Sequence, residues 1–283
     1  MKRPLILVAI LVALGCSLVL LVRGGGGRGA GGARDASRAG GGAGALPSPS
    51  ALLGGSPHDR ARAKVEDGKA LEELDRLDEA ERAFQEAAAL DTTFALAAAR
   101  LGALRLVRGD RAGARPLLER ALALDPRLAE ARFHFAFLLE EDGELERAEA
   151  EYREAVRADS GYAEAYNNLG YLLIRLGRAE EAVAALEEGR RRDPESEFLA
   201  KNLGRAYARL GRWADARPLL EGALPLAGHD PEVLLDLACL RRALGNEAEA
   251  QHLIRQYAGS QRDPERRSAG EALFAATAAT KKS

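Results

Sequence analysis

A short run of basic residues has the clearest spacing for binding chemistry in this sequence. Lys201, Arg205 and Arg209 recur every four residues, which places their side chains on one face of an α-helix. Such a basic stripe can hold carboxylate groups, either acidic side chains or a carboxyl terminus. The spacing therefore predicts a surface that binds an anionic partner.

Residue types that carry catalysis or bind metals are few and scattered. The two cysteines are Cys16, inside an apolar run, and Cys239, which we expect to be a small helix residue. The four histidines lack a metal-ligand spacing such as HExxH. The sequence has no GxSxG elbow, and its carboxylates follow helix-surface spacing instead of converging. We therefore expect no enzyme activity, no cofactor, no metal site and no small-molecule substrate.

The elements that position the basic stripe follow a period of 34 residues. Alanine recurs at this interval, and glycine stands five residues before it in all units but the first, where Asp75 takes its place. The alanines are Ala80, Ala114, Ala148, Ala182, Ala216 and Ala250, and the glycines are Gly109, Gly143, Gly177, Gly211 and Gly245. Six units result. They span residues 61–94, 95–128, 129–162, 163–196, 197–230 and 231–264.

Each unit contains two blocks of apolar residues at helical spacing, which predicts two antiparallel helices joined by a tight turn. Small residues at the eighth and twentieth places of a unit let the two backbones approach closely. The turn glycines suit the left-handed conformation that often ends a helix. Pro116 and Pro218 lie early in second helices, where we expect a late helix start or a slight bend.

The repeated pattern of aromatic, leucine-glycine, leucine, glycine, alanine, bulky apolar, alanine and proline resembles the tetratricopeptide repeat over roughly residues 61–264. The resemblance implies an all-α fold, a right-handed superhelical solenoid of about six antiparallel helix pairs. Asp67, Asp75 and Tyr257 depart from the pattern, as is common in terminal repeats. Residues 265–283 are expected to hold a basic tail and a short capping helix at 271–279, with a frayed alanine-rich tail as the alternative.

The resemblance also implies a binding surface, because in this family the concave face lined by first helices binds partners. That face uses the second, fifth, ninth, twelfth and thirteenth places of each unit. The places select Leu96, Leu106, Val107, Phe133, Phe137, Asn167, Tyr171, Ile174, Phe198, Lys201, Arg205 and Arg209. A peptide is expected to lay apolar side chains on the aromatic residues and acidic groups on the basic stripe. Alternatively, the phenylalanines pack inside the solenoid and the arginines pair with nearby glutamates.

The first 23 residues are predicted to form an uncleaved membrane anchor. Lys2 and Arg3 precede an uncharged, mainly apolar run at 5–22, which Arg23 closes. A helix of that length spans about 27 Å, close to the thickness of a bilayer's hydrocarbon core. The alternative is a lipoprotein signal, because residues 13–16 loosely resemble a lipobox in which Cys16 would be acylated.

Residues 24–60 are glycine-rich, contain few large apolar groups, and are predicted to form a disordered, flexible linker. The chain has a formal net charge of −2. The first 60 residues carry seven basic and two acidic groups, and the tail from Glu265 carries +2, which leaves about −9 on the repeats. The repeats are therefore acidic, which argues against nucleic acid as a partner. A very short basic amino-terminal tail favours a single-pass protein of a bacterial inner membrane with periplasmic repeats.

These features predict a non-enzymatic, membrane-tethered scaffold. It would bind protein or peptide partners in its groove for the assembly of an envelope complex. The alternative is an assembly factor similar to the repeat-built pilotin lipoproteins of type IV pili, acylated at Cys16.

Overall fold

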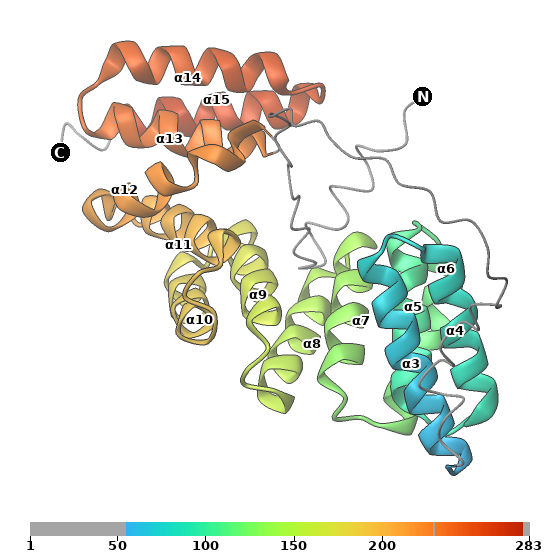
Figure 1. Cartoon of the computed structure of the whole chain (residues 1–283). Helices are drawn as coiled ribbons and strands as arrows, with labels where there is room; N and C mark the ends of the chain where they lie inside the picture. The colour runs from blue at the N-terminus through green and yellow to red at the C-terminus, as the bar shows by residue number, and fades with distance from the viewer. Residues whose placement is uncertain (1–54, 229, 280–283) are drawn as a thin grey trace, which may run out of the picture. The chain divides into compact units, whose positions relative to one another are not determined.

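The computed structural model describes residues 55–228 and 230–279, and the regular elements in these ranges are all helical (Figure 1). The elements are α3 (Pro57–Glu73), α4 (Leu77–Leu90), α5 (Ala95–Val107), α6 (Arg111–Leu124), α7 (Ala129–Glu141), α8 (Leu145–Ala158), α9 (Ala163–Arg175), α10 (Ala179–Arg192), α11 (Glu197–Arg209), α12 (Trp213–Gly222), the 3-10 helix η1 (Leu224–Gly228), α13 (Pro231–Ala243), α14 (Glu247–Ser260) and α15 (Pro264–Ala279). The predicted anchor, Cys16 and the linker up to residue 54 lie outside the described residues. Within the described ranges, no helix has both the length and the hydropathy that a bilayer crossing requires.

The helices fall into two compact units, α3–α6 and α7–α15, and in each unit they pack in consecutive pairs. The pairs are α3 with α4, α5 with α6, α7 with α8, α9 with α10, α11 with α12, and α13 with α14. First helices also contact one another, as α9 does with α11, α11 with α13, and α13 with α15. The predicted helix pairs are therefore confirmed, and α9, α11, α13 and α15 line one face, called here the first-helix face.

The turns inside the pairs have the backbone conformation that the sequence predicts. At Gly109, φ is +77°, and two hydrogen bonds close the end of α5. The Gly109 amide donates to the Leu106 carbonyl and the Asp110 amide donates to the Arg105 carbonyl, both at 2.9 Å. Among the described non-glycine residues, only Asp75 has a positive φ, of 57°. The first unit therefore makes the same turn without glycine.

Close contact inside a pair depends on the small residue at the eighth place, but its partner is a large side chain. A Cβ atom on Gly170 would lie 2.3 Å from Cγ of Leu186, and one on Gly68 would lie 2.3 Å from the Phe84 ring. Leu186 and Phe84 occupy the twenty-fourth place of their units. The first helix thus leaves room for the bulky residue of the second helix, while the alanine at the twentieth place is buried beside it.

The expected late helix starts at the prolines are wrong. Helix α6 starts at Arg111 and contains Pro116. Helix α12 starts at Trp213, the equivalent place of its unit, and contains Pro218. A proline near the start of a helix removes only one hydrogen-bond donor, so the helix can continue through it. Helix α12 instead ends early, with 10 residues against 14 in α6. Pro225 follows its end, at the place that Ala123 takes in unit two, and stops the helix.

The first helix begins earlier than the sequence indicated. The predicted linker extended to residue 60, whereas α3 starts at Pro57 behind a capping box. The Ser56 hydroxyl accepts from the Asp59 amide at 3.2 Å, and the Asp59 carboxylate accepts from the Ser56 amide at 2.9 Å. His58, which the sequence placed in the linker, contacts Asp91 at 2.7 Å between Nδ1 and Oδ2. Residues 57–60 therefore belong to the folded unit.

The last helix is longer than the predicted capping segment at 271–279. Helix α15 starts at Pro264 and has 16 residues, so the alternative of a frayed tail is wrong for residues 264–279. Phe274 is 5% exposed and joins the apolar cluster of the sixth pair. The Tyr257 ring lies against Gly270, where a Cβ atom would stand 2.3 Å away. Tyr257, a departure from the family pattern, is thus the residue on which α15 packs.

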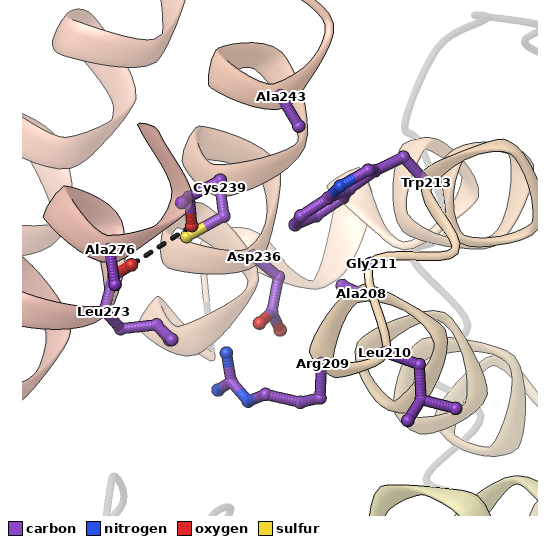
Figure 2. A pocket seen from close by; sticks show the side chains of 11 residues that line it. Ala208, Arg209, Leu210, Gly211, Trp213, Asp236, Cys239, Ala243, Leu273 and Ala276 are labelled. Carbon is purple, nitrogen blue, oxygen red and sulfur yellow. Dashed lines mark hydrogen bonds between the residues drawn. The ribbon is translucent and has the colours of Figure 1, made fainter. Parts of the chain in front are cut away.

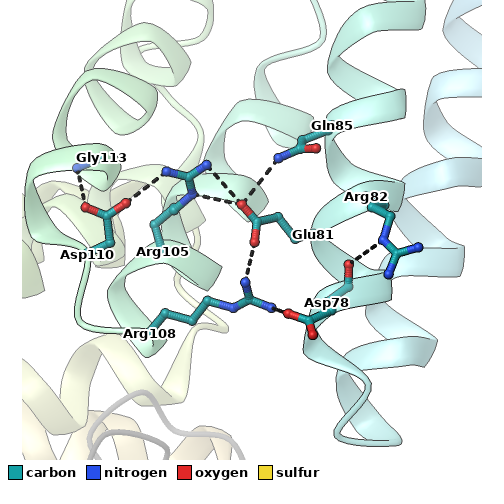
Figure 3. A network of polar contacts seen from close by, with 8 residues as sticks. All are labelled: Asp78, Glu81, Arg82, Gln85, Arg105, Arg108, Asp110 and Gly113. Carbon is teal, nitrogen blue, oxygen red and sulfur yellow. Dashed lines mark hydrogen bonds and ion pairs between the residues drawn. The ribbon is translucent and has the colours of Figure 1, made fainter.

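Charged residues join neighbouring pairs, as Figure 3 shows for α4 and α5. The Glu81 carboxylate accepts from Nε of Arg105 at 3.0 Å and also from Arg108. Arg108 donates to Asp78 at 2.6 Å, and Arg105 donates to Asp110 at 2.8 Å. At this boundary, charged side chains therefore join one helix pair to the next.

Candidate partner-binding surface

The two phenylalanines of the predicted groove have different environments. Phe133 is fully buried, and its ring centroid lies 5.9 Å from that of Tyr152 and 5.0 Å from that of Tyr162. Phe137, one helical turn later on α7, is partly exposed. Phe133 therefore packs in the core, as the alternative interpretation had it, and Phe137 remains accessible.

Tyr171 is the most exposed aromatic residue of the predicted set. Its exposed fraction is 37%, and the Arg175 guanidinium carbon lies 5.8 Å from the centre of its ring. Asn167, one turn earlier on α9, accepts a hydrogen bond from Nδ2 of Asn202 on α11 at 2.9 Å. Burial raises the pKa of Tyr171. Helix α9 thus presents an aromatic ring beside a cation, while the Asn167 oxygen is bound to α11.

The basic stripe of α11 is divided between inner and outer positions. Lys201 Nζ lies 2.7 Å from Oδ2 of Asp230, and Arg205 Nε lies 2.6 Å from Oδ2 of Asp236. The Lys201 and Arg205 side chains are only 10% and 4% exposed. Arg209 is exposed and forms no ion pair within the described part of the chain. Of the three predicted cations, Arg209 alone is presented to solvent.

Three acidic residues of α13 and its N-cap, Asp230, Glu232 and Asp236, stabilise the charge of Arg205 in this stripe. Burial alone would raise the pKa of Asp230, but the charges of Lys201 and Arg205 hold it below its usual value. Burial raises the pKa of Glu232, against the opposing charge of Arg205. The cluster is close to neutral, so Lys201 and Arg205 serve the contact between α11 and α13.

The remaining predicted residues are mostly covered. Leu106, Val107 and Ile174 are 3%, 7% and 8% exposed. Leu96 packs against the core of the first compact unit, and Phe198 is partly exposed with Lys201 Nζ 5.6 Å from its ring centre. The partly or fully exposed members of the predicted surface are therefore Leu96 in the compact unit α3–α6, and Phe137, Asn167, Tyr171, Phe198 and Arg209 in the compact unit α7–α15.

A pocket that the sequence did not reveal lies on the first-helix face (Figure 2). It has a volume of about 570 Å³ and is formed by the end of α11, the start of α12, the middle of α13 and the last turns of α15. Its lining comprises Ala208, Arg209, Leu210, Gly211, Trp213, Asp236, Cys239, Ala243, Leu273, Ala276 and Thr277. Burial raises the pKa of Cys239 to about 11, so its thiol is an inert part of the wall.

Extending the 34-residue period by one more unit would have predicted several of the residues that line this pocket. If a seventh unit is counted from residue 265, Leu273, Ala276 and Thr277 occupy its ninth, twelfth and thirteenth places. Cys239 takes the ninth place of the sixth unit, and Arg209 takes the thirteenth place of the fifth. The sequence interpretation stopped at six units, so the contribution of α15 to this face was missed.

Comparison with known proteins agrees with the repeat geometry. Residues 99–163, 139–205 and 200–227 match three family models, each described as a tetratricopeptide repeat. Residues 99–227 belong to the tetratricopeptide repeat (TPR) family. The TPR period is the one that the turn glycines and buried alanines follow in the structure, and the described helices form a TPR solenoid.

Several solved structures share the TPR fold. The chain is similar to pilF of Pseudomonas aeruginosa, with a TM-score of 0.62 and 20% identity over 76% of this chain and 99% of that one. PilW, described as a widely conserved type IV pilus biogenesis factor, matches with a TM-score of 0.57 and 20% identity, over 71% of this chain and 93% of PilW. A chain of the APC/C hetero-tetramer Cut9–Hcn1 matches with a TM-score of 0.60 and 16% identity, over 77% of this chain and 42% of that one. No curated protein sequence matches. At these identities the likeness establishes the fold alone.

Proposed function

We propose that this TPR chain is a non-enzymatic scaffold that binds protein or peptide partners on its first-helix face. The observation that carries the proposal is the set of accessible groups there: the Tyr171 ring on α9, and the Arg209 cation beside an apolar pocket on α11. Aromatic and arginine side chains with apolar surroundings are the groups that contribute most to protein interfaces. The buried ion pairs beneath them hold the helices in place.

The scaffold is proposed to be tethered to a bacterial inner membrane by residues 5–22, with its repeats in the periplasm. Support comes from the sequence, which places an uncharged apolar run of bilayer length before a glycine-rich linker. In this arrangement the partner-binding face stays near the membrane while turning freely. The proposed process is assembly of an envelope complex.

A second candidate function is that of a pilotin-like assembly factor acylated at Cys16. It is favoured by the similarity in fold to PilW, a type IV pilus biogenesis factor, over 71% of this chain. The two candidates differ in the fate of the amino terminus. A lipoprotein begins at an acylated Cys16, whereas an anchored scaffold keeps residues 1–15.

Affinity capture from native membranes followed by mass spectrometry tests the main proposal. The wild-type chain is compared with a Tyr171→Ala, Phe198→Ala double variant and with Arg255→Glu, a control at an exposed position on α14. We expect specific partners to be lost from the double variant and kept by the control. Identical partner lists for all three proteins would remove the first-helix face from the function.

Intact-mass measurement of the purified chain separates the two candidates. Loss of residues 1–15 together with added acyl mass, abolished by Cys16→Ser, would support the lipoprotein. A full-length, unacylated chain that stays in the membrane fraction supports the anchored scaffold.

A further inference from the structure

The pocket on the first-helix face has mostly apolar walls. Trp213 lies across from Cys239, and Leu273 and Ala276 close the side formed by α15 (Figure 2). Its volume of about 570 Å³ lies within the roughly 300–1,000 Å³ range of pockets that bind ligands. This surface can cover a large apolar side chain.

One accessible charge lies in this apolar setting. Arg209 lines the pocket, is exposed, and makes no ion pair within residues 55–228 and 230–279. Asp236 also lines the pocket, but its side chain is 0% exposed and is paired with Arg205. The pocket therefore presents a guanidinium group to a ligand, and an anion is the complementary group.

Helix α15 is held firmly enough to act as a wall. The guanidinium carbon of Arg242 lies 4.3 Å from the centre of the Phe274 ring. Arg242 Nη1 also donates to the Phe274 carbonyl at 3.3 Å. The Tyr257 hydroxyl donates to the Arg266 carbonyl at 2.8 Å. The helix is thus fixed to both α13 and α14, and the pocket is preformed.

We propose that this pocket binds an internal segment of a protein partner in which a large apolar side chain neighbours an acidic residue. The apolar side chain lies between Trp213 and Leu273, and the acidic side chain pairs with Arg209. This assignment rests on the proposed scaffold function and specifies its partner. A volume in the range of drug-sized ligands exceeds what one side chain fills, which favours a segment that passes through the pocket over a single terminal residue.

Selection from a random peptide library tests this assignment. The library consists of acetylated, amidated nonapeptides, and the bait is the whole 283-residue chain. Two variants alter the pocket from exposed positions: Arg209→Glu reverses its charge, and Ala276→Phe fills it from α15. Their matched controls, Arg255→Glu and Ala275→Phe, make the same changes at exposed positions that do not line the pocket.

We expect wild-type selection to enrich peptides with an acidic residue next to a large apolar one. Their affinity should fall about tenfold or more in each pocket variant and stay unchanged in the controls. Arg209→Glu should also shift selection toward basic residues. Circular dichroism melting shows whether each variant is folded before its binding is interpreted.

Two outcomes would overturn the assignment. Selected peptides that bind both pocket variants as tightly as wild type would place binding elsewhere on the scaffold, and the proposed function would stand without this pocket. Binding that appears only when the same peptides carry a free terminal carboxylate would replace the internal segment by a chain end. Failure of the scaffold proposal itself is seen separately, as unchanged partner lists in the membrane capture.

Discussion

Arg205 and Asp236 form a buried ion pair between the first helices of the fifth and sixth units. The distance between Nε and Oδ2 is 2.6 Å, and the two side chains are 4% and 0% exposed. Oδ1 of Asp236 and Nη2 of Arg205 are also buried and have no hydrogen-bond partner among the described residues. A single hydrogen bond therefore joins the pair. Asp236 contributes most to the compensation of the Arg205 charge, with smaller contributions from Asp230 and Glu232.

Asp236→Ala should destabilise the protein strongly, because it leaves the Arg205 charge buried without its partner. We expect a loss of about 3–5 kcal/mol in the free energy of unfolding, measured by urea denaturation followed by circular dichroism. The double change Arg205→Met, Asp236→Leu should recover most of this loss, because apolar side chains of similar size need no compensation.

The exposed pair of Arg108 and Asp78 provides the control. Asp78 is 83% exposed, so Asp78→Ala should cost less than about 1 kcal/mol. Equal losses for Asp236→Ala and Asp78→Ala would show that burial of the Arg205 pair has no energetic consequence.

Glu232→Gln should change how stability depends on pH. Burial raises the pKa of Glu232 above 4.5, with Arg205 and Arg209 opposing the shift and Asp230 and Asp236 adding to it. The folded protein therefore holds this proton more tightly than the unfolded chain does. Stability from this group is present at low pH and is lost as pH rises from about 4.5 through the folded pKa.

The variant removes that titration, so it should stabilise the protein at pH 7 relative to wild type and have a smaller effect at pH 4. Denaturation curves at both values check this. A variant that is less stable at pH 7 than at pH 4, each relative to wild type, would contradict the shift.

Cys239 should react very slowly with maleimides in the folded protein. It is 2% exposed, and burial raises its pKa to about 11, so only about one thiol in a thousand is ionised at pH 8. Labelling is followed by mass spectrometry in a Cys16→Ser background, with a urea-unfolded sample as the reference. Equal rates in the two samples would place Cys239 at the surface.

Asp75→Gly should stabilise the first helix pair. Asp75 has a φ of 57°, a conformation that costs a non-glycine residue strain and that glycine adopts freely. We expect a gain of about 0.5–1 kcal/mol, seen as a higher melting temperature. An unchanged or lower melting temperature would show that the Asp75 side chain offsets the strain.

Gly170→Ala should be costly although alanine favours helices. Its Cβ would lie 2.3 Å from Cγ of Leu186, so the two helices must separate or the leucine must leave its rotamer. We expect a loss of about 1–3 kcal/mol. The paired change Gly170→Ala, Leu186→Ala tests the cause, because it removes the clash while creating a cavity; Leu186→Ala alone is its reference.

The sequence predicted the helix pairs well because their signals recur every 34 residues. Each unit needs a positive φ at its turn and a small residue at its eighth place, so these residues recur and the period reveals them. The exact start of α3 depended instead on one local motif, the capping box of Ser56 and Asp59, which occurs once and has no repeated copy to draw attention to it.

The candidate surface was predicted less well because the partners of its side chains lie on other elements, far away in the sequence. The spacing of Lys201, Arg205 and Arg209 places them on one helix face, but it does not show that Asp230 and Asp236 meet two of them. Lys201 and Asp230 are 29 residues apart within the fifth unit, and Arg205 and Asp236 are 31 residues apart across its boundary with the sixth, so spacing along one helix reveals neither pair. Charge reversal at Arg205 would therefore test the fold, and Arg209 is the residue that tests binding.

Helix α15 also has a consequence for how many chains can join. Without α15, the apolar side chains of the sixth pair that pack against Phe274, such as Tyr257 and Cys239, would be uncovered. Stacks of repeats grow when such a face meets the open side of another repeat, and head-to-tail contacts of this kind produce filaments. The outer surface of α15 carries exposed charged residues such as Glu265, Arg266 and Glu271. A charged surface of this kind is a poor partner for an apolar repeat face, so α15 disfavours a head-to-tail contact through itself.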